Sequence, residues 1–422
     1  VMSGAARSLL EPGDDARPDR PILTTTDFEV DGVFQPHQLQ GKLREYADMA
    51  RKAASNGRML EGFVIDGKCL EYALEPDNEK AFVDIAEVCK TVICCRVSPK
   101  QKGAVVQLIK RVKKAITLAI GDGANDCNMI QSADVGVGIR GLEGLQAFNV
   151  CDYGISQFRF IKILLLAHGR WCYRRIAILV CYMFYKNVVL VLPQYFLGFV
   201  SGFSGQKLYN DAMYQMFNLL HSGLPAILFG VLDQDVSKET SLQNPQLYKL
   251  GLQNSYLSFR VAAWWLLGGL WHAIVVFTIP YVTMSNGNLA HEDGKASDIW
   301  MVGSVVYFLV CIVVNVILLM ESMYMNWAVV GAIIISLLGW FFEHGMLAGY
   351  FGTVITFELH GTIQRMFGSG MMFLVMLVSV IVALMVNVQA KGLRRALFPT
   401  VLHKVQDEVL SRKAWAESSD LS

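Results

Sequence analysis

Six long apolar runs dominate the second part of this 422-residue sequence. They fall at about 176–200, 212–232, 260–283, 299–320, 327–344 and 370–389. Each approaches the ~20 apolar residues that a helix needs to cross the hydrocarbon core of a bilayer. Within lipid, every backbone polar group must be bonded internally, so segments of this kind span as helices. We therefore predict an all-α multi-span transmembrane domain over 176–390.

Composition and flanking charge support a membrane location for these runs. Hydrophobic residues make up 53% of the sequence and charged residues 17%, which is too apolar for one soluble globule. Arg174 and Arg175 precede the first run, and Arg394 and Arg395 follow the last. Basic flanks mark the cytosolic side, so the tail 391–422 is predicted to be cytosolic. The basic residues form no extended patch, so nucleic acid is not an expected partner.

The region before the runs alternates strand-like and helix-like segments. Residues 1–60 are predicted to be a linker or insertion with one amphipathic helix over 35–56. Short apolar strands and helices alternate over 61–157, which predicts a parallel sheet covered by helices on both faces. A basic helical segment, 158–175, leads without a break into the first apolar run and is predicted to be a stalk.

The loop Gly121–Asp126 is the stretch with the clearest chemistry. It follows the apolar run 115–120, so it should lie at the carboxyl end of a strand, where open α/β sheets bind ligands. Asp122, Asn125 and Asp126 offer the hard oxygen atoms that Mg²⁺ takes, with water and substrate phosphate completing the octahedron. The same residues would also suit an acidic, glycine-rich surface turn, and spacing alone leaves both alternatives open.

Gly121–Asp126 resembles the hinge motif of P-type ATPases, and further segments resemble the type IV branch, the phospholipid flippases. The resemblance extends from about Phe63 to about Gln406. Its segments, in the expected order, are Phe63–Leu74, Cys95–Lys102, Gln157–Phe160, His168–Trp171, Phe184–Asn187, Phe203–Gln206 and Leu232–Asp235. The resemblance implies that 61–157 is the carboxyl-terminal part of an α/β haloacid-dehalogenase-like (Rossmann-like) phosphorylation domain. It also implies that the six runs are the last six of the family's ten spans.

The resemblance assigns catalytic roles to four residues of the α/β region. It implies that Lys102 holds the phosphoryl group, whose spread negative charge needs a cation. It implies that Asp122 and Asp126 coordinate Mg²⁺, directly or through water. Asn125 would bond the phosphorylated carboxylate or orient the loop. On the bare sequence, Lys102 would be an ordinary exposed helix residue.

The resemblance also implies an ATP-binding role for residues near two strand ends. Asp66 and Gly67 match a family element near the nucleotide-binding hinge, and Arg96 matches a residue that contacts nucleotide. Lys102 and Asn125 would complete this set. The alternative for this element, Asp66–Lys68, is a turn that simply ends a strand, and it applies above all to Lys68.

Polar residues inside the first two apolar runs are the candidate transport residues. Lys186 lies about midway along the first run, beside Asn187, where a charge costs roughly 2.5–3.5 kcal/mol on insertion scales. Such residues face a pathway or a partner, although a lysine on an off-centre span can also snorkel to the surface. Asn218, in the second run, matches a polar family position near the lipid route. Pro193 is predicted to interrupt the first span, and Pro225 to break or kink the second.

The same two runs lack carboxylates. There is no Asp or Glu over 177–200 or 212–231. A dehydrated Ca²⁺ or Na⁺ would find almost no hard anionic ligand there. Neutral amides and one lysine suit a phospholipid headgroup, so the residues favour a lipid pump over a cation pump.

The family's nucleophilic aspartate, in Asp-Lys-Thr-Gly-Thr, is not in this chain. We therefore expect the carboxyl-terminal part of an ATP-driven flippase, which works through an aspartyl-phosphate and is inactive as this chain alone. The alternative is a truncated, non-catalytic membrane partner or regulator of a P-type ATPase. A stand-alone phosphatase is disfavoured, because Asp66 lacks the surroundings of that nucleophile. The resemblance further implies a two-span accessory β-subunit and a plasma-membrane, Golgi or endosomal location.

Overall fold

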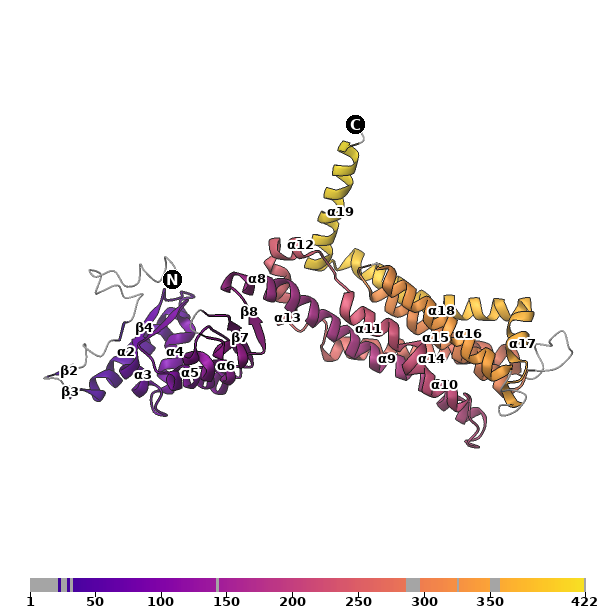
Figure 1. Cartoon of the computed structure of the whole chain (residues 1–422), viewed down its shortest axis with the longest axis horizontal. Helices are drawn as coiled ribbons and strands as arrows, with labels where there is room; N and C mark the ends of the chain where they lie inside the picture. Colours follow the sequence, from indigo (N-terminus) through magenta and orange to yellow (C-terminus); the bar gives the residue numbers. More distant parts are fainter. Residues whose placement is uncertain are drawn as a thin grey trace. The chain divides into compact units, whose positions relative to one another are not determined.

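The computed structural model of the protein describes residues 22–23, 29–30, 33–141, 144–285, 297–324, 326–349 and 357–420. The chain divides into two compact units, Val1–Ile161 and Lys162–Ser422. The first is an α/β unit, and the described residues of the second are helical or irregular (Figure 1). Most of the predicted linker before Gln35 lies outside the described residues.

The α/β unit contains two three-stranded parallel sheets, in the orders β1-β4-β5 and β6-β7-β8, and an antiparallel pair, β2-β3. The strands are β1 (Ile22–Leu23), β2 (Glu29–Val30), β3 (Val33–Phe34), β4 (Phe63–Asp66), β5 (Val92–Cys95), β6 (Leu118–Gly121), β7 (Val135–Ile139) and β8 (Tyr153–Ile155). The predicted parallel pairing is present, but in two small sheets instead of one. Within the described residues, no strand pairs with both β5 and β6, so the two sheets remain separate.

Helices of this unit pack on the two parallel sheets, some against β4 and others against β6 and β7. They are α2 (Pro36–Ser55), α3 (Gly67–Ala73), α4 (Glu79–Val88), α5 (Pro99–Lys113), α6 (Cys127–Ser132) and α7 (Gln146–Asn149). The core joins Leu43 of α2, Phe82 of α4 and Leu108 of α5 to Phe63 of β4. The helix predicted over 35–56 is α2, whereas β8 and α7 were not predicted.

A capping box fixes the start of α5. Ser98 Oγ accepts from the Gln101 N–H, and Gln101 Oε1 accepts from the Ser98 N–H. Pro99 occupies the first helical position, where its missing N–H leaves no donor unpaired. This start sets the position of Lys102 one turn into the helix.

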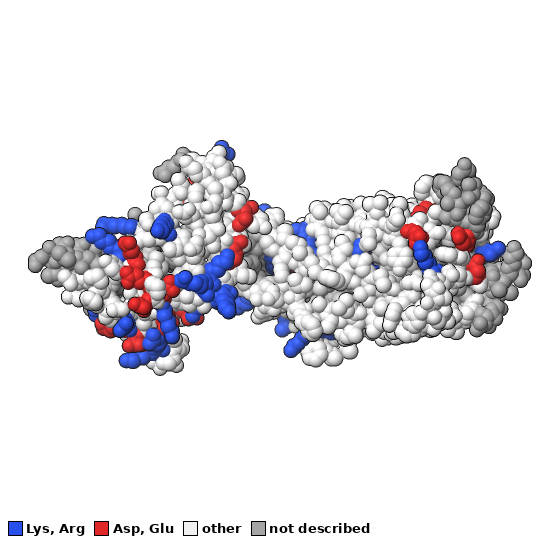
Figure 2. Space-filling view, turned by 90° about the horizontal axis from the view of Figure 1, so that it is seen from below, with Lys and Arg blue, Asp and Glu red and all other residues white. Residues whose placement is uncertain are grey.

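Six helices of the second unit are long and apolar enough to cross a membrane. The corresponding segments are Phe158–Val200, Asp211–Leu232, Phe259–Met284, Ile299–Glu321, Trp327–Ala348 and Gly370–Leu397. The predicted all-α multi-span region is therefore present. On the face shown in Figure 2, this unit carries few charged side chains along its length, whereas the α/β unit carries many.

The first membrane segment is a continuous helical run. It comprises η3 (Phe158–Phe160), α8 (Ile161–Ile163), a π-helical part η4 (Leu164–Gly169) and α9 (Arg170–Val200). The expectation that Pro193 interrupts this span is wrong, because α9 continues through it. Helices in membranes tolerate proline where the freed backbone groups find other partners or small adjustments.

The second membrane segment is interrupted at its middle. It consists of α10 (Asp211–Met216), a π-helical turn η5 (Phe217–His221) and α11 (Gly223–Leu232), with Ser222 at φ −141° between the last two. The predicted break is present, but it precedes Pro225, which lies in the first turn of α11. Proline has no N–H for the carbonyl four residues earlier, that of His221. Asn315 Nδ2 supplies the missing donor to the His221 oxygen at 2.8 Å.

The remaining helices complete the bundle. They are α14 (Phe259–Met284), α15 (Ile299–Glu321), α16 (Trp327–Ala348) and α18 (Gly370–Leu397), with α12 (Lys238–Gln243), η6 (Pro245–Tyr248), α13 (Lys249–Leu252), η9 (Phe357–Leu359), α17 (Thr362–Gly368) and α19 (Val401–Asp420) outside the spans. In its most apolar window α15 is 83% buried, more than any other span, so it is the centre of the bundle.

Buried ion pairs lie where α9 begins and α11 ends. Arg170 contacts Asp235 with both terminal nitrogens and Ser241 with Nε. Arg174 pairs with Asp233. The side chains of both pairs are at most 3% exposed.

Candidate functional site

Lys102 and Asp126 form the centre of the candidate site in the α/β unit. Lys102 Nζ lies 2.8 Å from Asp126 Oδ1, with side chains 31% and 13% exposed. Asp126 Oδ2 accepts weakly from the Asp122 N–H at 3.3 Å. The side chains of Asp122 and Asn125 are exposed at the end of β6. The structure thus brings Lys102, which lies on α5, close to the loop Gly121–Asp126 at the end of β6.

Glycine is required at Gly121 for this arrangement. A Cβ atom there would lie 2.3 Å from the Cβ of Asp126 and 2.8 Å from its Oδ2. Real Cβ atoms do not approach other atoms so closely, so a side chain at position 121 would displace the carboxylate of Asp126. The sharp turn after β6 therefore depends on Gly121, as the sequence suggested.

The ends of β4 and β5 hold the residues predicted to contact nucleotide. Asp66 and Cys95 are register partners, so Asp66 lies beside the residue before Arg96. A Cβ on Gly67 would lie 2.4 Å from the Arg96 carbonyl oxygen, so this close approach needs glycine. Arg96 itself is exposed and has φ +52°. The structure brings these three residues together.

Asp66 also has a structural role. Its Oδ1 accepts from the Cys69 N–H at 3.0 Å and caps the start of α3. Gln101, which was not assigned a role of its own, donates from Nε2 to the Gly67 carbonyl at 2.7 Å. Gln101 therefore connects the strand ends to the helix that carries Lys102.

The carboxylates of the loop fit Mg²⁺ better than a metal that needs a full protein cage. Within the described residues, no group of three His, Cys, Asp or Glu side chains is placed to hold a metal ion. Mg²⁺ keeps several water ligands and is commonly held by one or two carboxylates plus substrate phosphate. Asp122 and Asp126 satisfy that requirement.

Lys186 is the charged residue at the centre of the membrane unit. Its side chain is buried, with the residue 1% exposed. Nζ donates to Ser222 Oγ at 3.0 Å and lies 5.8 Å from the centre of the Phe217 ring. Among the described residues, Lys186 forms no ion pair, so a buried ammonium group is held by one hydroxyl and one aromatic face. Both partners belong to the interruption between α10 and α11.

The other two candidate transport residues do not join Lys186. Asn187 is exposed, and its Nδ2 donates to the Met183 carbonyl of its own helix at 2.9 Å. Asn218 is also exposed. Ser222 is the polar partner that the structure adds. The sequence noted its position near Pro225 but gave no signal that it would face Lys186 from another span.

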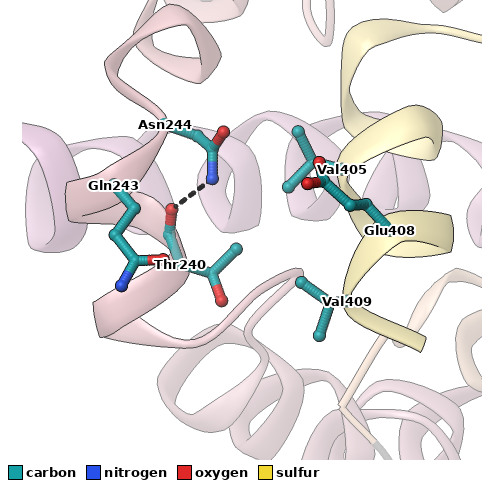
Figure 3. A pocket seen from close by; sticks show the side chains of 6 residues that line it. All are labelled: Thr240, Gln243, Asn244, Val405, Glu408 and Val409. Carbon is teal, nitrogen blue, oxygen red and sulfur yellow. Dashed lines mark hydrogen bonds between the residues drawn. The ribbon is translucent and has the colours of Figure 1, made fainter. Parts of the chain in front are cut away.

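A pocket of about 160 Å³ lies between α12 and α19, away from these residues (Figure 3). Its lining is Thr240, Gln243, Asn244, Val405, Glu408 and Val409. Asn244 Nδ2 donates to the Thr240 carbonyl beside it. Ligand pockets usually measure about 300–1,000 Å³, so this one is too small for a nucleotide or a lipid headgroup.

Residues 148–400 match the family model of the carboxyl-terminal region of phospholipid-translocating P-type ATPases. The chain is 39% identical over 346 residues to the phospholipid-transporting ATPase DRS2 of Saccharomyces cerevisiae. The aligned region covers 82% of this chain and 26% of the yeast protein. It is 43% identical over 276 residues to phospholipid-transporting ATPase 10 of Arabidopsis thaliana. That aligned region covers 65% of this chain and 23% of the plant protein.

A human protein, the probable phospholipid-transporting ATPase IM, is 37% identical over 357 residues, which cover 81% of this chain and 29% of the human protein. The chain thus spans about a quarter of the length of these relatives.

Proposed function

This chain belongs to the type IV P-type ATPases, the phospholipid-translocating family, and from that premise we propose that it is the carboxyl-terminal part of a flippase that uses ATP to move phospholipid toward the cytosolic leaflet. The chain is a multi-pass integral membrane protein. The activity belongs to a longer protein, in which an aspartate outside this chain accepts the γ-phosphoryl group of ATP.

The α/β unit would serve phosphorylation on a haloacid-dehalogenase-like fold. Lys102 would hold the phosphoryl group. Asp126 fixes its ammonium group at the carboxyl end of β6, where the phosphoryl group would bind. Asp122 and Asp126 would hold Mg²⁺, which supplies positive charge against the phosphate oxygens. Asn125, exposed on the same loop, bonds the phosphorylated carboxylate or orients the loop.

The ATP site would extend to the ends of β4 and β5. Arg96 is exposed there and available to the nucleotide, while Gly67 permits the close approach of the two strand ends. Asp66 caps α3 and so fixes the position of Gly67. In this arrangement Asp66 and Gly67 position the site, and Arg96 contacts ATP.

The buried, unpaired ammonium of Lys186 is the observation that carries the transport proposal. A charge within a span normally pairs with another group or faces a pathway. Among the described residues, the partners of Lys186 are Ser222 Oγ and the Phe217 ring, and both lie at an interrupted helix. An anionic phosphate group of a lipid would supply the missing counter-charge. Asn187 and Asn218, which are exposed in this chain, would line the outer part of the route.

The wider setting is also a proposal. The basic residues at both ends of the bundle support a cytosolic location for the α/β unit and the tail. The membrane would be the plasma membrane or that of the Golgi or endosomes. A two-span accessory β-subunit would accompany the full-length protein.

The test uses the full-length protein in liposomes, with phospholipid-stimulated ATP hydrolysis and movement of a fluorescent phospholipid as readouts. Lys102→Ala should lower turnover by about 10²–10³-fold, the usual effect of removing one transition-state donor. Lys186→Met should weaken lipid stimulation by about 10–100-fold, since a hydrogen bond to a charged group contributes ~1.5–3 kcal/mol. Lys249→Met, which removes an exposed lysine, is the control. Unchanged lipid dependence in Lys186→Met would overturn the transport role.

A further inference from the structure

A second polar cluster adjoins the interruption between α10 and α11. His221, the residue before Ser222, is fully buried. Its Nε2 lies 3.0 Å from Oε2 of Glu343 on α16, whose side chain is 13% exposed. Its Nδ1 lies 2.8 Å from the hydroxyl of Tyr307 on α15. Neither His221 nor Glu343 has a role in the proposed transport of lipid.

Donor and acceptor counting fixes the state of the His221 ring. The Tyr307 hydroxyl donates its only proton to the Met213 carbonyl at 2.6 Å. Tyr307 must therefore accept from His221, so Nδ1 carries a proton. In a neutral imidazole with a proton on Nδ1, Nε2 is a lone-pair acceptor. Nε2 then faces the carboxylate oxygen of Glu343, which is also an acceptor.

Two acceptors at 3.0 Å repel one another unless a proton lies on one of them. The pair can be an imidazolium facing a carboxylate, or a neutral ring facing a carboxylic acid. Both states contain one proton more than a neutral imidazole facing a carboxylate. The contact lies outside hydrogen-bond alignment, and Glu343 Oε1 is buried without a partner. Nothing else in the described surroundings satisfies these atoms.

The groups around the pair supply no other compensating charge. The titratable groups that face it are Tyr307 and Cys311 of α15, which are ordinarily neutral, and His344 of α16. Lys186 of α9 reaches Ser222, the residue after His221, and forms no ion pair with Glu343 among the described residues. A buried ionised Glu343 beside a neutral His221 would thus be uncompensated, which is costly inside a membrane.

From this geometry we infer that His221 and Glu343 form a site that binds one proton between α16 and the interrupted helix. The proton enters through Glu343, the partly exposed partner, which lies five residues before the end of α16 at Ala348. Loss of the proton leaves two acceptors in contact, so Nε2 and Oε2 must separate. His221 is held to α15 through its backbone oxygen and its ring, so the separation displaces the Glu343 side chain or α16.

The test is a protonation measurement on this chain in phosphatidylcholine nanodiscs. Nitrogen NMR of labelled histidine reports the proton on Nε2, and infrared spectroscopy reports the carbonyl stretch of a protonated carboxyl group. Between about pH 5 and pH 8, the range in which histidine serves as a switch, we expect either a protonated Nε2 or a protonated Glu343. If the proton leaves within this range, the signal of the group that carries it should be lost in a single step. A proton retained throughout also supports the site.

Three variants assign the signals. Glu343→Gln keeps the size of the side chain and should remove the carboxyl band and change the state of the His221 ring. His221→Asn retains a donor toward Tyr307 and should alter the carboxyl band. His272→Gln is the matched control, because His272 is also buried in a span and its described hydrogen-bond partners, Tyr185, Asn387 and the Ala383 backbone, are neutral. It should leave both signals unchanged.

A bare Nε2 facing an ionised Glu343 in the folded chain would overturn the inference, as would titration of the two groups at unrelated pH values. If His221→Asn does not fold, the wild type and Glu343→Gln decide the question. The measurement needs neither ATP nor lipid transport. Its outcome is therefore independent of the proposed flippase function.

Discussion

Arg174 and Lys110 each pair with an aspartate, but their surroundings differ. The Arg174–Asp233 side chains are 3% and 0% exposed, whereas those of Lys110 and Asp134 are 45% and 31% exposed. Asp233 also accepts from Ser322 Oγ and from two backbone N–H groups. The membrane unit thus provides a buried charge with several partners, while the α/β unit leaves its pair in water. The same chemistry should stabilise the two units to very different extents.

The two lysines proposed to bind phosphate, Lys102 and Lys186, also differ in burial. Here the partly exposed lysine has a carboxylate partner, and the buried lysine has neutral partners. Lys102 is partly exposed and already has a carboxylate, Asp126, at 2.8 Å. Lys186 is buried, and a hydroxyl and an aromatic ring are the partners that the structure gives it. Arriving phosphate must therefore share Lys102 with Asp126, but it would complete the partners of Lys186. Under the proposed function, Lys102 would orient a reaction, whereas Lys186 would await an anion.

Arg174→Met should produce the largest loss of stability. It leaves Asp233 as a buried carboxylate without its cation, which typically costs about 3–5 kcal/mol. The three remaining donors to Asp233 should place the effect toward the lower end of that range. Equilibrium unfolding of the chain in detergent measures this effect.

The matched control for that prediction is Lys110→Met, which removes the exposed partner and should change stability little. The double variant Arg174→Met/Asp233→Asn should recover part of the loss, since the uncompensated charge is gone. Equal losses for Arg174→Met and Lys110→Met would contradict the comparison. No recovery in the double variant would show that packing, and not charge, sets the cost.

Lys186→Met should have a much smaller effect on stability. A lysine at the centre of a span costs roughly 2.5–3.5 kcal/mol on insertion scales, and a desolvated cation–π contact returns about 2 kcal/mol. The hydrogen bond from Nζ to Ser222 Oγ returns at least ~1.5 kcal/mol more, so we expect a change in stability close to zero for the chain without lipid. Unfolding beside Lys249→Met as a control measures this change. A clear loss would mean that Lys186 serves the fold and not an anionic ligand.

The sequence predicted those features that depend on local pattern. Apolar runs of sufficient length gave the six membrane helices, and Gly121 indicated the turn that the close approach of Asp126 requires. These properties are encoded within a few neighbouring residues, so no tertiary contact is needed to infer them.

Features that depend on contacts between spans were missed or misplaced. Pro193 was expected to interrupt α9, which instead continues through it. Asn315 satisfies the carbonyl freed by Pro225 from 94 residues away. Glu343 was visible as a carboxylate inside the fifth apolar run. Its partner could not be inferred, because His221 lies on another span and the contact depends on how α16 packs.

The Asp134 pair offers the smallest effect, and one that is read as a pKa shift. A hydrogen bond from Lys110, followed by one from the Thr117 N–H, lowers the pKa of Asp134 from 3.8 to about 2. Because folding lowers this pKa, the pair contributes its full stabilisation above about pH 4 and loses it as the pH falls toward 2. Lys110→Met should move the pKa back toward 3.8, as measured by NMR titration of the Asp134 carboxyl group in the whole chain. Lys100→Met, an exposed lysine of the same helix, should not. A wild-type midpoint near 3.8 would mean that water already screens this pair completely, and the contrast with Arg174 would then be sharper still.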